Sequence, residues 1–177
     1  MRGLQRDALG LEPGVVRLVE YDPRWPALFD AEKRRIRDAC AGLVLKLEHV
    51  GGTSIPGMCT KPVLDLAAGR PPGSPLQEYV AALERAGYEH RGEQGVRGRQ
   101  FFSRGQPRAY HLHLVEEDGT LWREYLAFRD HLRADAEAAR QFADLKRALA
   151  ARFSADREAY VDAKSAHVRE VLRQAFR

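Results

Sequence analysis

A predicted pair of strands joined by two adjacent glycines constrains this chain most. Residues 43–49 alternate between leucines and other side chains and run directly into Gly51 and Gly52. That pattern indicates a half-buried strand that ends in a tight turn. Residues 61–67 follow as a second strand with one carboxylate, Asp65, between two leucines. The sequence therefore predicts a glycine turn and an acidic side chain on neighbouring strands.

The rest of the chain alternates strand and helix patterns before it becomes entirely helical. We expect further strands at 15–20, 100–104 and 108–115. Apolar residues at helical spacing, with N-terminal caps and glycine ends, predict helices at 22–39, 74–86, 120–133, 136–152 and 156–176. This order favours an α+β fold, with a mixed sheet flanked by helices and a C-terminal helical layer.

The length of 177 residues suits one domain. We expect a flexible N-terminal segment at 1–14 and a single domain at 15–177, of which 120–177 is the three-helix part. Two isolated cysteines form no disulfide framework, and no apolar run is long enough for a signal peptide or a membrane span. We therefore expect a cytoplasmic protein with no membrane partner.

The net charge of +4 favours anionic ligands. Basic and acidic residues are interleaved along the helices instead of gathered in blocks, which is also the pattern of an ordinary solvated surface. Nucleic acid is therefore not the expected partner, whereas a nucleotide or a phosphorylated small molecule is compatible with the charge.

The glycine turn has the chemistry of a phosphate site. Gly51 and Gly52 allow backbone N–H groups to approach a phosphate, and Thr53 and Ser54 can add hydroxyl donors or cap a helical turn. Asp65 offers a hard oxygen ligand for Mg²⁺. The alternatives are a plain tight turn for the glycines and an ion pair of Asp65 with Lys61 or Arg70.

Several separated motifs resemble one known family. They are HVGGTSIPG from His49, KPVLD from Lys61, FRDHL from Phe128, the Leu145-Lys146 pair, and Tyr160 followed by Lys164. Together they are similar to the GrpB family over about residues 15–175. That family is placed in the polymerase-β-like nucleotidyltransferase superfamily, so the resemblance implies a nucleoside triphosphate with Mg²⁺ at the glycine turn and Asp65 as the catalytic, metal-binding carboxylate.

The sequence departs from the superfamily pattern at two places. The second acid of the Asp-x-Asp pattern is replaced by Ala67, and the later strand carries His111 and His113 instead of an acid. Two-metal transfer needs carboxylates for both ions, and one carboxylate is poor support for them. The resemblance thus bears on the fold more strongly than on the reaction.

His111 and His113 have strand spacing and face the same side of the predicted sheet. We expect Asp65 to lie on that face, so that the three side chains line one cleft and bind a divalent metal, either Mg²⁺ or Mn²⁺, with Zn²⁺ as a further possibility. Hydrogen bonding to solvent or to an acid is the alternative for both histidines.

One cation lies on or beside the apolar stripe of each C-terminal helix. These cations are Arg129, Lys146 and Lys164. A single such residue is usually a snorkelling side chain, but three suggest a shared anion pocket. With Lys61 they are our candidate ligand-binding cations.

The function that this pattern favours is binding of a nucleotide or phosphorylated ligand, with metal-dependent nucleotidyl transfer to an unidentified hydroxyl acceptor. Ala67 favours a second interpretation, a non-catalytic nucleotide-sensing or partner-binding module. The pair His111 and His113 favours a third, a metal hydrolase with histidine and aspartate ligands.

Overall fold

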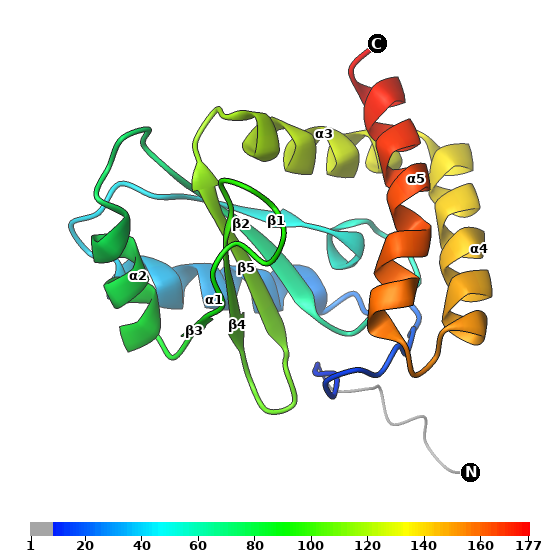
Figure 1. Ribbon diagram of the computed structural model, residues 1–177, viewed down its shortest axis with the longest axis horizontal. Helices are drawn as coiled ribbons and strands as arrows, with labels where there is room; N and C mark the ends of the chain where they lie inside the picture. The colour runs from blue at the N-terminus through cyan, green and yellow to red at the C-terminus, as the bar shows by residue number, and fades with distance from the viewer. Residues whose placement is uncertain (1–8) are drawn as a thin grey trace.

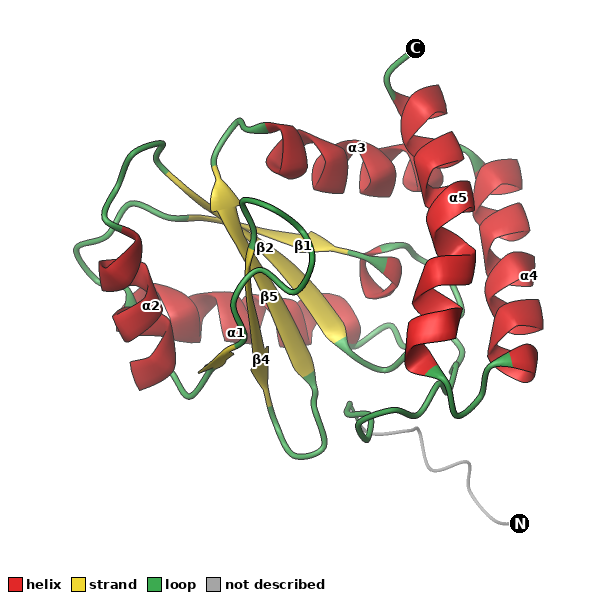
Figure 2. Cartoon of the chain, in the orientation of Figure 1, coloured by secondary structure: helices red, strands yellow, loops and turns green. Residues whose placement is uncertain are grey.

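The chain folds around a mixed sheet with helices on both faces (Figures 1 and 2). The structure is a computed structural model that describes residues 9–177. Within these residues the strands are β1 (Lys46–Val50), β2 (Leu64–Arg70), β3 (Glu89–His90), β4 (Gln100–Arg104) and β5 (Tyr110–Glu116). They pair in the order β1-β2-β5-β4-β3. The predicted α+β class is confirmed.

The strand β2 lies between an antiparallel and a parallel partner. It pairs antiparallel with β1 and parallel with β5, while β4 pairs antiparallel with both β5 and β3. A parallel pair needs a crossover connection, and here α2, β3 and β4 all intervene between β2 and β5. This crossover brings together side chains that are more than forty residues apart in the sequence.

Two helices cover one face of the sheet and a third covers the other (Figure 1). The helices are α1 (Trp25–Ala39), α2 (Leu76–Arg85), α3 (Thr120–Ala134), α4 (Ala136–Arg152) and α5 (Arg157–Ala175), and a 3₁₀ turn, η1, spans Gly52–Ser54. The helices α1 and α2 pack on one face and α3 on the other, and α4 and α5 pack beside α3.

Alternation along the strands separates the two faces. Leu64, Leu66 and Leu112 face α1 and α2 in the main core and are fully buried. The opposite face carries Ala67, which packs with Trp122 of α3. A third cluster joins the segment after η1 to the C-terminal helices, and its buried members are Ile55, Met58, Cys59, Leu132, Ala138, Phe142, Ala143 and Val171.

The C-terminal helices agree with their predicted ranges to within two residues. Each of the last two begins at an aspartate cap: Asp135 accepts a hydrogen bond from the backbone N–H of Ala138, and Asp156 accepts one from Ala159. These caps satisfy N–H groups that a helix end leaves unpaired. Local sequence was enough here because capping and apolar spacing act within a few residues.

The predicted strand at 15–20 is wrong. In that segment Val19 forms an isolated bridge with Thr60, and the backbone N–H of Val16 donates to the carbonyl of Ser154. Val16 thus contacts the loop between α4 and α5, whereas Val19 packs against the main core, and neither joins the sheet. Of the predicted flexible segment, residues 1–8 lie outside the described residues, and the buried Leu11 bridges to Arg108.

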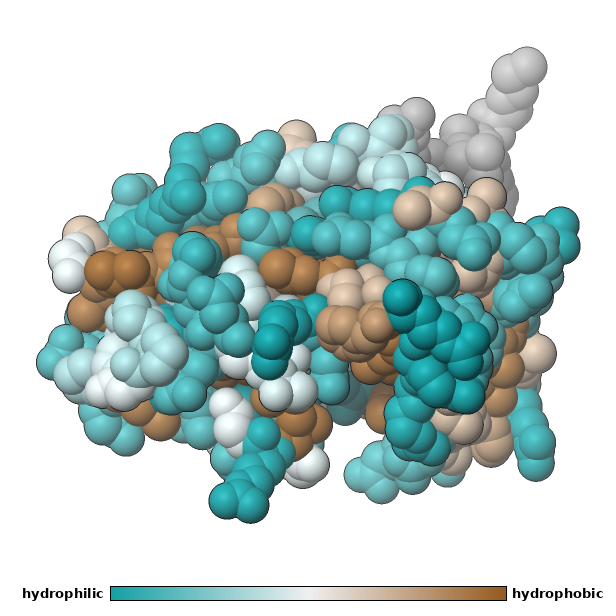
Figure 3. Space-filling view, turned by 90° about the horizontal axis from the view of Figure 1, so that it is seen from above, coloured by the Kyte–Doolittle hydropathy of each residue, from teal (hydrophilic) through white to brown (hydrophobic). Residues whose placement is uncertain are grey.

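The visible surface is mainly hydrophilic, with hydrophobic side chains in patches between charged ones (Figure 3). In the part of the chain that the structure describes, no helix is long and apolar enough to cross a membrane.

A buried carboxylate ties α1 to the sheet. Glu32 is 3% exposed and accepts hydrogen bonds from Arg35, Arg104 and the hydroxyl of Tyr88. Burial alone would raise the pKa of Glu32, but these three donors lower it. The hydrogen bonds of Glu32 to Tyr88 and Arg104 therefore hold α1 against β3 and β4, and they compensate the buried charge of the Glu32 carboxylate.

We expect Glu32→Gln to lower the free energy of unfolding by roughly 2 kcal/mol or more, because two arginines lose their charged partner in a poorly solvated place. Urea unfolding followed by circular dichroism measures this. The control is Glu84→Gln, an exposed residue of α2, which should change the free energy by less than about 0.5 kcal/mol. Equal effects of the two substitutions would show that the Glu32 pairs contribute nothing specific.

Candidate functional site

Asp65 lies where three parts of the chain meet. It is opposite Val50 at the end of β1 and beside His111 of β5 in the pairing register. Its side chain is 28% exposed, so it is open to a ligand although the strand that carries it is central. The Asp65 side chain lies on the face of the sheet that α3 covers, and α3 packs over Ala67, two residues farther along β2.

The two histidines of β5 converge on Asp65. His111 Nδ1 is 3.3 Å and His113 Nε2 is 3.2 Å from the same oxygen, Asp65 Oδ1. The prediction that the three side chains share one face is therefore confirmed. Phe101 of β4 packs against both rings, and Tyr125 of α3 packs against His113, so the imidazoles are held in position from two sides.

These contacts fix the protonation of the group at neutral pH. Burial alone would raise the pKa of Asp65, but hydrogen bonds from His111 and His113 lower it well below its usual value. Burial lowers the pKa of His111, and the attraction of Asp65 offsets this only in part. We therefore assign an ionised Asp65 beside a neutral His111 that donates its Nδ1–H.

Close approach explains both glycines of the turn. A Cβ on Gly51, whose φ is +68°, would lie 2.7 Å from Asp65 Oδ2. A Cβ on Gly52 would lie 2.2 Å from the hydroxyl oxygen of Thr60 and 3.3 Å from Lys146 Nζ. The missing side chains therefore leave the turn in direct contact with a carboxylate on one side and a buried ammonium on the other.

The hydroxyls of Thr53 and Ser54 are used inside the protein. Both residues are buried; Thr53 Oγ1 is 2.9 Å from His49 Nε2, and Ser54 Oγ donates to the carbonyl of Gly51 at 2.6 Å. Burial lowers the pKa of His49 to about 4, which leaves its ring neutral. The two hydroxyls, predicted as phosphate donors, thus form hydrogen bonds that shape the turn. The polar groups next to the turn are the Asp65 carboxylate and the Lys146 ammonium.

Three lysines whose charges repel one another form what we call the lysine cluster: Lys61, Lys146 and Lys164. The ammonium groups of Lys61 and Lys164 lie 5.8 and 4.8 Å from the centroid of the Tyr160 ring. Lys146 lies over the ring of Phe142, is 2% exposed and donates to the carbonyl of Cys59. The cluster joins the loop before β2 to α4 and α5, next to the glycine turn.

Burial and mutual repulsion make the cluster costly when it is fully charged. Burial, together with the charges of Lys164 and Lys61, lowers the pKa of Lys146 to about 7. Burial likewise lowers the pKa of Lys164 to about 8, with Lys61 as the next cause and an opposing attraction from Asp65. Asp65 is the carboxylate that acts on Lys61 and Lys164. The charge of one carboxylate therefore acts on two of the three cations.

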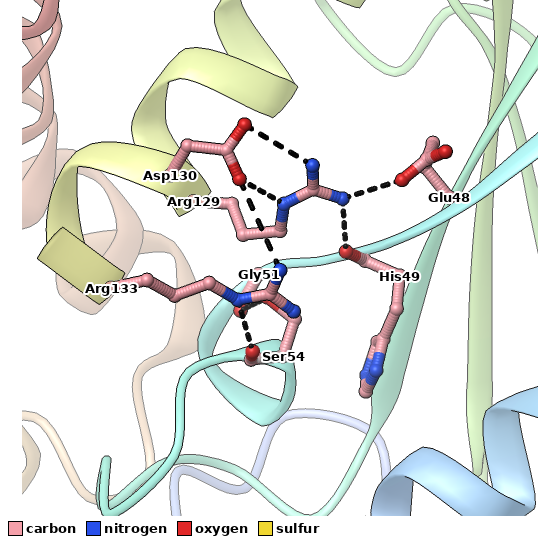
Figure 4. A network of polar contacts seen from close by, with 7 residues as sticks. All are labelled: Glu48, His49, Gly51, Ser54, Arg129, Asp130 and Arg133. Atoms are coloured by element: carbon pink, nitrogen blue, oxygen red, sulfur yellow. Dashed lines mark hydrogen bonds and ion pairs between the residues drawn. The ribbon is translucent and has the colours of Figure 1, made fainter.

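Arg129 does not belong to the lysine cluster, which corrects the expectation of one pocket shared by all three C-terminal helices. Its guanidinium donates to Glu48, to the carbonyl of His49 and to Asp130, and the neighbouring Arg133 donates to the carbonyl of Ser54 (Figure 4). These bonds anchor α3 to the end of β1 and to η1. The physical reason is the carboxylate of Glu48, which faces α3 and pairs with the arginine.

The site does not fit two metal ions. Ala67, at the position of the second acid, is 0% exposed in the cluster with Val50 and Trp122. Among residues 9–177 no group of three or more histidine, cysteine or acidic side chains is arranged to hold a metal ion. Asp65 and the two histidines come together as a hydrogen-bonded group, and their predicted role as metal ligands stays a prediction.

Sequence reasoning missed Thr60 and Tyr160 as parts of the site. Thr60 lies against Gly52, and Tyr160 is the ring that two lysines share. The signal for Tyr160 was present: it lies four residues before Lys164, and residues four apart meet on one face of a helix. No local pattern marked Thr60, because its contact is with the turn and depends on how the loop between them folds.

A family model, a relative and a solved structure identify the family of this chain. The family model described as "GrpB protein" matches residues 15–174. A UPF0157 protein of Pseudomonas aeruginosa is 40% identical over 169 residues, covering 91% of this chain and 68% of that protein. The crystal structure of the conserved protein GrpB from Enterococcus faecalis is similar with a TM-score of 0.82 and 30% identity, over 90% of this chain and 96% of that one.

A more distant likeness concerns the fold alone. The structure of the Cid1 poly(U) polymerase with MgGTP bound has a TM-score of 0.51 and 13% identity, over 75% of this chain and 44% of that one. The resemblance to nucleotidyltransferase folds predicted from the sequence is confirmed at this level.

We expect Gly51→Ala to destabilise the protein by at least about 1 kcal/mol more than Gly57→Ala, because its Cβ would overlap the Asp65 carboxylate. Gly57 is the matched control: its φ of +76° is also left-handed, but no atom lies within 4 Å of its added Cβ. Thermal and urea unfolding of the two variants measure the difference. Equal losses would mean that Gly51 is needed only for its backbone conformation.

Proposed function

This chain belongs to the GrpB family, and we propose that it binds a nucleotide or another phosphorylated small molecule between the glycine turn and the lysine cluster. The observation that supports this most is the excess of buried positive charge there. Lys61 and Lys164 share the ring of Tyr160 and the attraction of one carboxylate, Asp65, and the neighbouring Lys146 donates to the carbonyl of Cys59. Buried charges are normally paired, and a phosphate would supply the missing negative charge.

Binding would work by restoring charge to the lysines. An unliganded Lys146 or Lys164 loses its proton near neutral pH because the charged form is poorly solvated and repelled by its neighbours. A phosphate group nearby favours the charged form of both, so the ligand is bound together with protons from solvent. The backbone of Gly52 lies close to Lys146, because a Cβ there would stand 3.3 Å from Lys146 Nζ.

Nucleotidyl transfer is the second candidate, supported by the shared fold with the Cid1 poly(U) polymerase structure. The residues present argue against the two-metal form of that reaction. Ala67 replaces one acid, and the remaining acid, Asp65, accepts hydrogen bonds from two imidazoles through one oxygen. We therefore favour a binding module, and we treat Mg²⁺, Mn²⁺ or Zn²⁺ at Asp65 as a variable for the binding assay.

The direct test is a thermal-shift panel of nucleoside triphosphates, nucleoside monophosphates and pyrophosphate, each with and without Mg²⁺, Mn²⁺ or Zn²⁺. A ligand at 100 times its Kd adds about 2.7 kcal/mol of stability. Binding without metal supports the module, binding that requires metal together with release of pyrophosphate supports transfer, and no shift with any phosphorylated ligand contradicts the proposal.

We expect Lys164→Met to weaken binding of the best panel ligand by at least about tenfold, because it removes one of the charges that face the phosphate. Lys33→Met is the matched control: Lys33 is also half-buried over an aromatic ring, 5.6 Å from the Phe29 centroid, but lies on α1. Calorimetric titration of both folded variants decides between binding and packing. If both variants bind like the wild type, Lys164 only packs against Tyr160.

The pH dependence should have opposite signs for binding and for folding. Between about pH 7 and 9 Lys146 and Lys164 lose protons in the unliganded protein but keep them when a phosphate is bound. The affinity for the ligand should therefore fall as pH rises. The free energy of unfolding without ligand should rise over the same range, because the unfolded lysines still hold their protons. Titrations in buffers of different ionisation enthalpy should also show proton uptake on binding at pH 8. An affinity that is flat from pH 6.5 to 9 would contradict this.

A further inference from the structure

A large open cleft lies on the same face of the sheet, next to the site. Its volume is about 830 Å³, within the range of small-molecule sites. Its wall includes Phe101 and Ser103 of β4, which are paired with His113 and His111 in the register. The other walls come from Glu12 and Pro13, the hairpin from Arg104 to Arg108, and Arg157 at the start of α5. The cleft thus lies beside the strand that neighbours the two histidines and reaches the β4–β5 hairpin.

Most of the charges that line this cleft are paired. Arg91 forms an ion pair with Glu89, and Arg104 forms one with the buried Glu32. Arg108 and Arg157 differ, because neither side chain has an ion pair or a hydrogen bond within residues 9–177. Arg108 Nε is buried without a hydrogen-bond partner. The remaining carboxylate of the cleft wall, Glu12, is exposed.

The two unpaired arginines are electrostatically linked to the lysine cluster. Burial is the main cause of the lowered pKa values of Arg108, Lys61 and Lys164, and the charge of Arg157 lowers all three further. Arg157 is therefore close enough to Arg108 and to the lysine cluster for its charge to act on both. We call Arg108, Arg157 and the lysine cluster the positive strip; Arg108 and Arg157 line the cleft.

We propose that Arg108 and Arg157 form a second phosphate site, separate from the lysine cluster, at the hairpin end of the cleft. Guanidinium groups bind phosphate by paired N–H donors, and a phosphate there would neutralise two like charges that form no ion pair within residues 9–177. The inference rests on the proposed function, which places a first phosphate at the lysine cluster. With the arginine site, the positive strip accommodates two phosphate groups at once. These are either the distal phosphate of one extended ligand or the phosphate of a second molecule bound beside the first.

The probe for this site is inorganic pyrophosphate, titrated by calorimetry into the wild type, the double variant Arg108→Gln/Arg157→Gln, and Lys164→Met. We expect two classes of site in the wild type. The arginine variant should lose one class, with a drop in affinity of at least about tenfold, and Lys164→Met should weaken the other. The control is Arg140→Gln, an exposed residue of α4 paired with Glu137, which should titrate like the wild type.

Two further measurements keep the inference falsifiable if the double variant fails to fold. The single variant Arg157→Gln should lose the same class of site, and pyrophosphate should protect Arg108 and Arg157 of the wild type from phenylglyoxal, as mapped by mass spectrometry. The inference is overturned if pyrophosphate titrates the arginine variants as it titrates the wild type. It is also overturned if phenylglyoxal modifies both arginines fully at saturating pyrophosphate. If the arginine variants lose one class of pyrophosphate site while Lys164→Met titrates like the wild type, the proposed lysine site fails and the second site stands.

The stoichiometry of a nucleoside triphosphate then separates the two sources of phosphate. One molecule per chain, weakened by both the lysine and the arginine variants, identifies an extended ligand that spans the strip. Two molecules per chain, each weakened by one variant, identify a second phosphorylated molecule. Binding that only the lysine variant weakens would overturn the arginine site.

Discussion

The parallel pairing of β2 with β5 is the contact on which the site depends. It sets Asp65 beside His111 and points both side chains to the face that α3 covers only in part. Because strand side chains alternate, a register shift of one residue would turn Asp65 into the leucine core. The leucines on the opposite face of both strands, Leu64, Leu66 and Leu112, hold that register because they are fully buried against α1 and α2.

The C-terminal helices convert this sheet edge into a charged site. The helices α4 and α5 bring Lys146 and Lys164 to the glycine turn, and the aromatic ring of Tyr160 fills the space between two of the ammonium groups. The folded chain thus accepts a local loss of stability from poorly solvated cations. Such a loss is typical of sites that are completed by a ligand.

Arg129 of α3 shows another way in which a buried cation is stabilised. Arg129 is buried, as Lys146 is, but Glu48, Asp130 and the carbonyl of His49 satisfy its donors. It therefore stabilises the packing of α3 on β1 without needing a ligand. The contrast between Arg129 and the lysine cluster shows how the partners of a buried cation, more than its burial, separate a structural charge from a binding one.

The sequence by itself determined the parts that depend on near neighbours. Helix spacing and ends gave the C-terminal helices, alternation gave the paired strands, and the two-residue period placed His111 and His113 on one face. It also marked the glycine turn and Asp65. The strand expected at 15–20 failed because β-branched residues favour extended backbone wherever it packs, and they do not say which partner it finds.

Only the tertiary structure decided which distant groups meet. The sequence placed Arg129, Lys146 and Lys164 in equivalent positions, and the fold gave carboxylates to the first and left the other two together with Lys61. Likewise, nothing near Arg108 or Arg157 in the sequence indicates that they line one cleft. Charge compensation acts through space, so it is set by the packing of α3 on the sheet and of α5 against α3 and α4, and not by spacing along the chain.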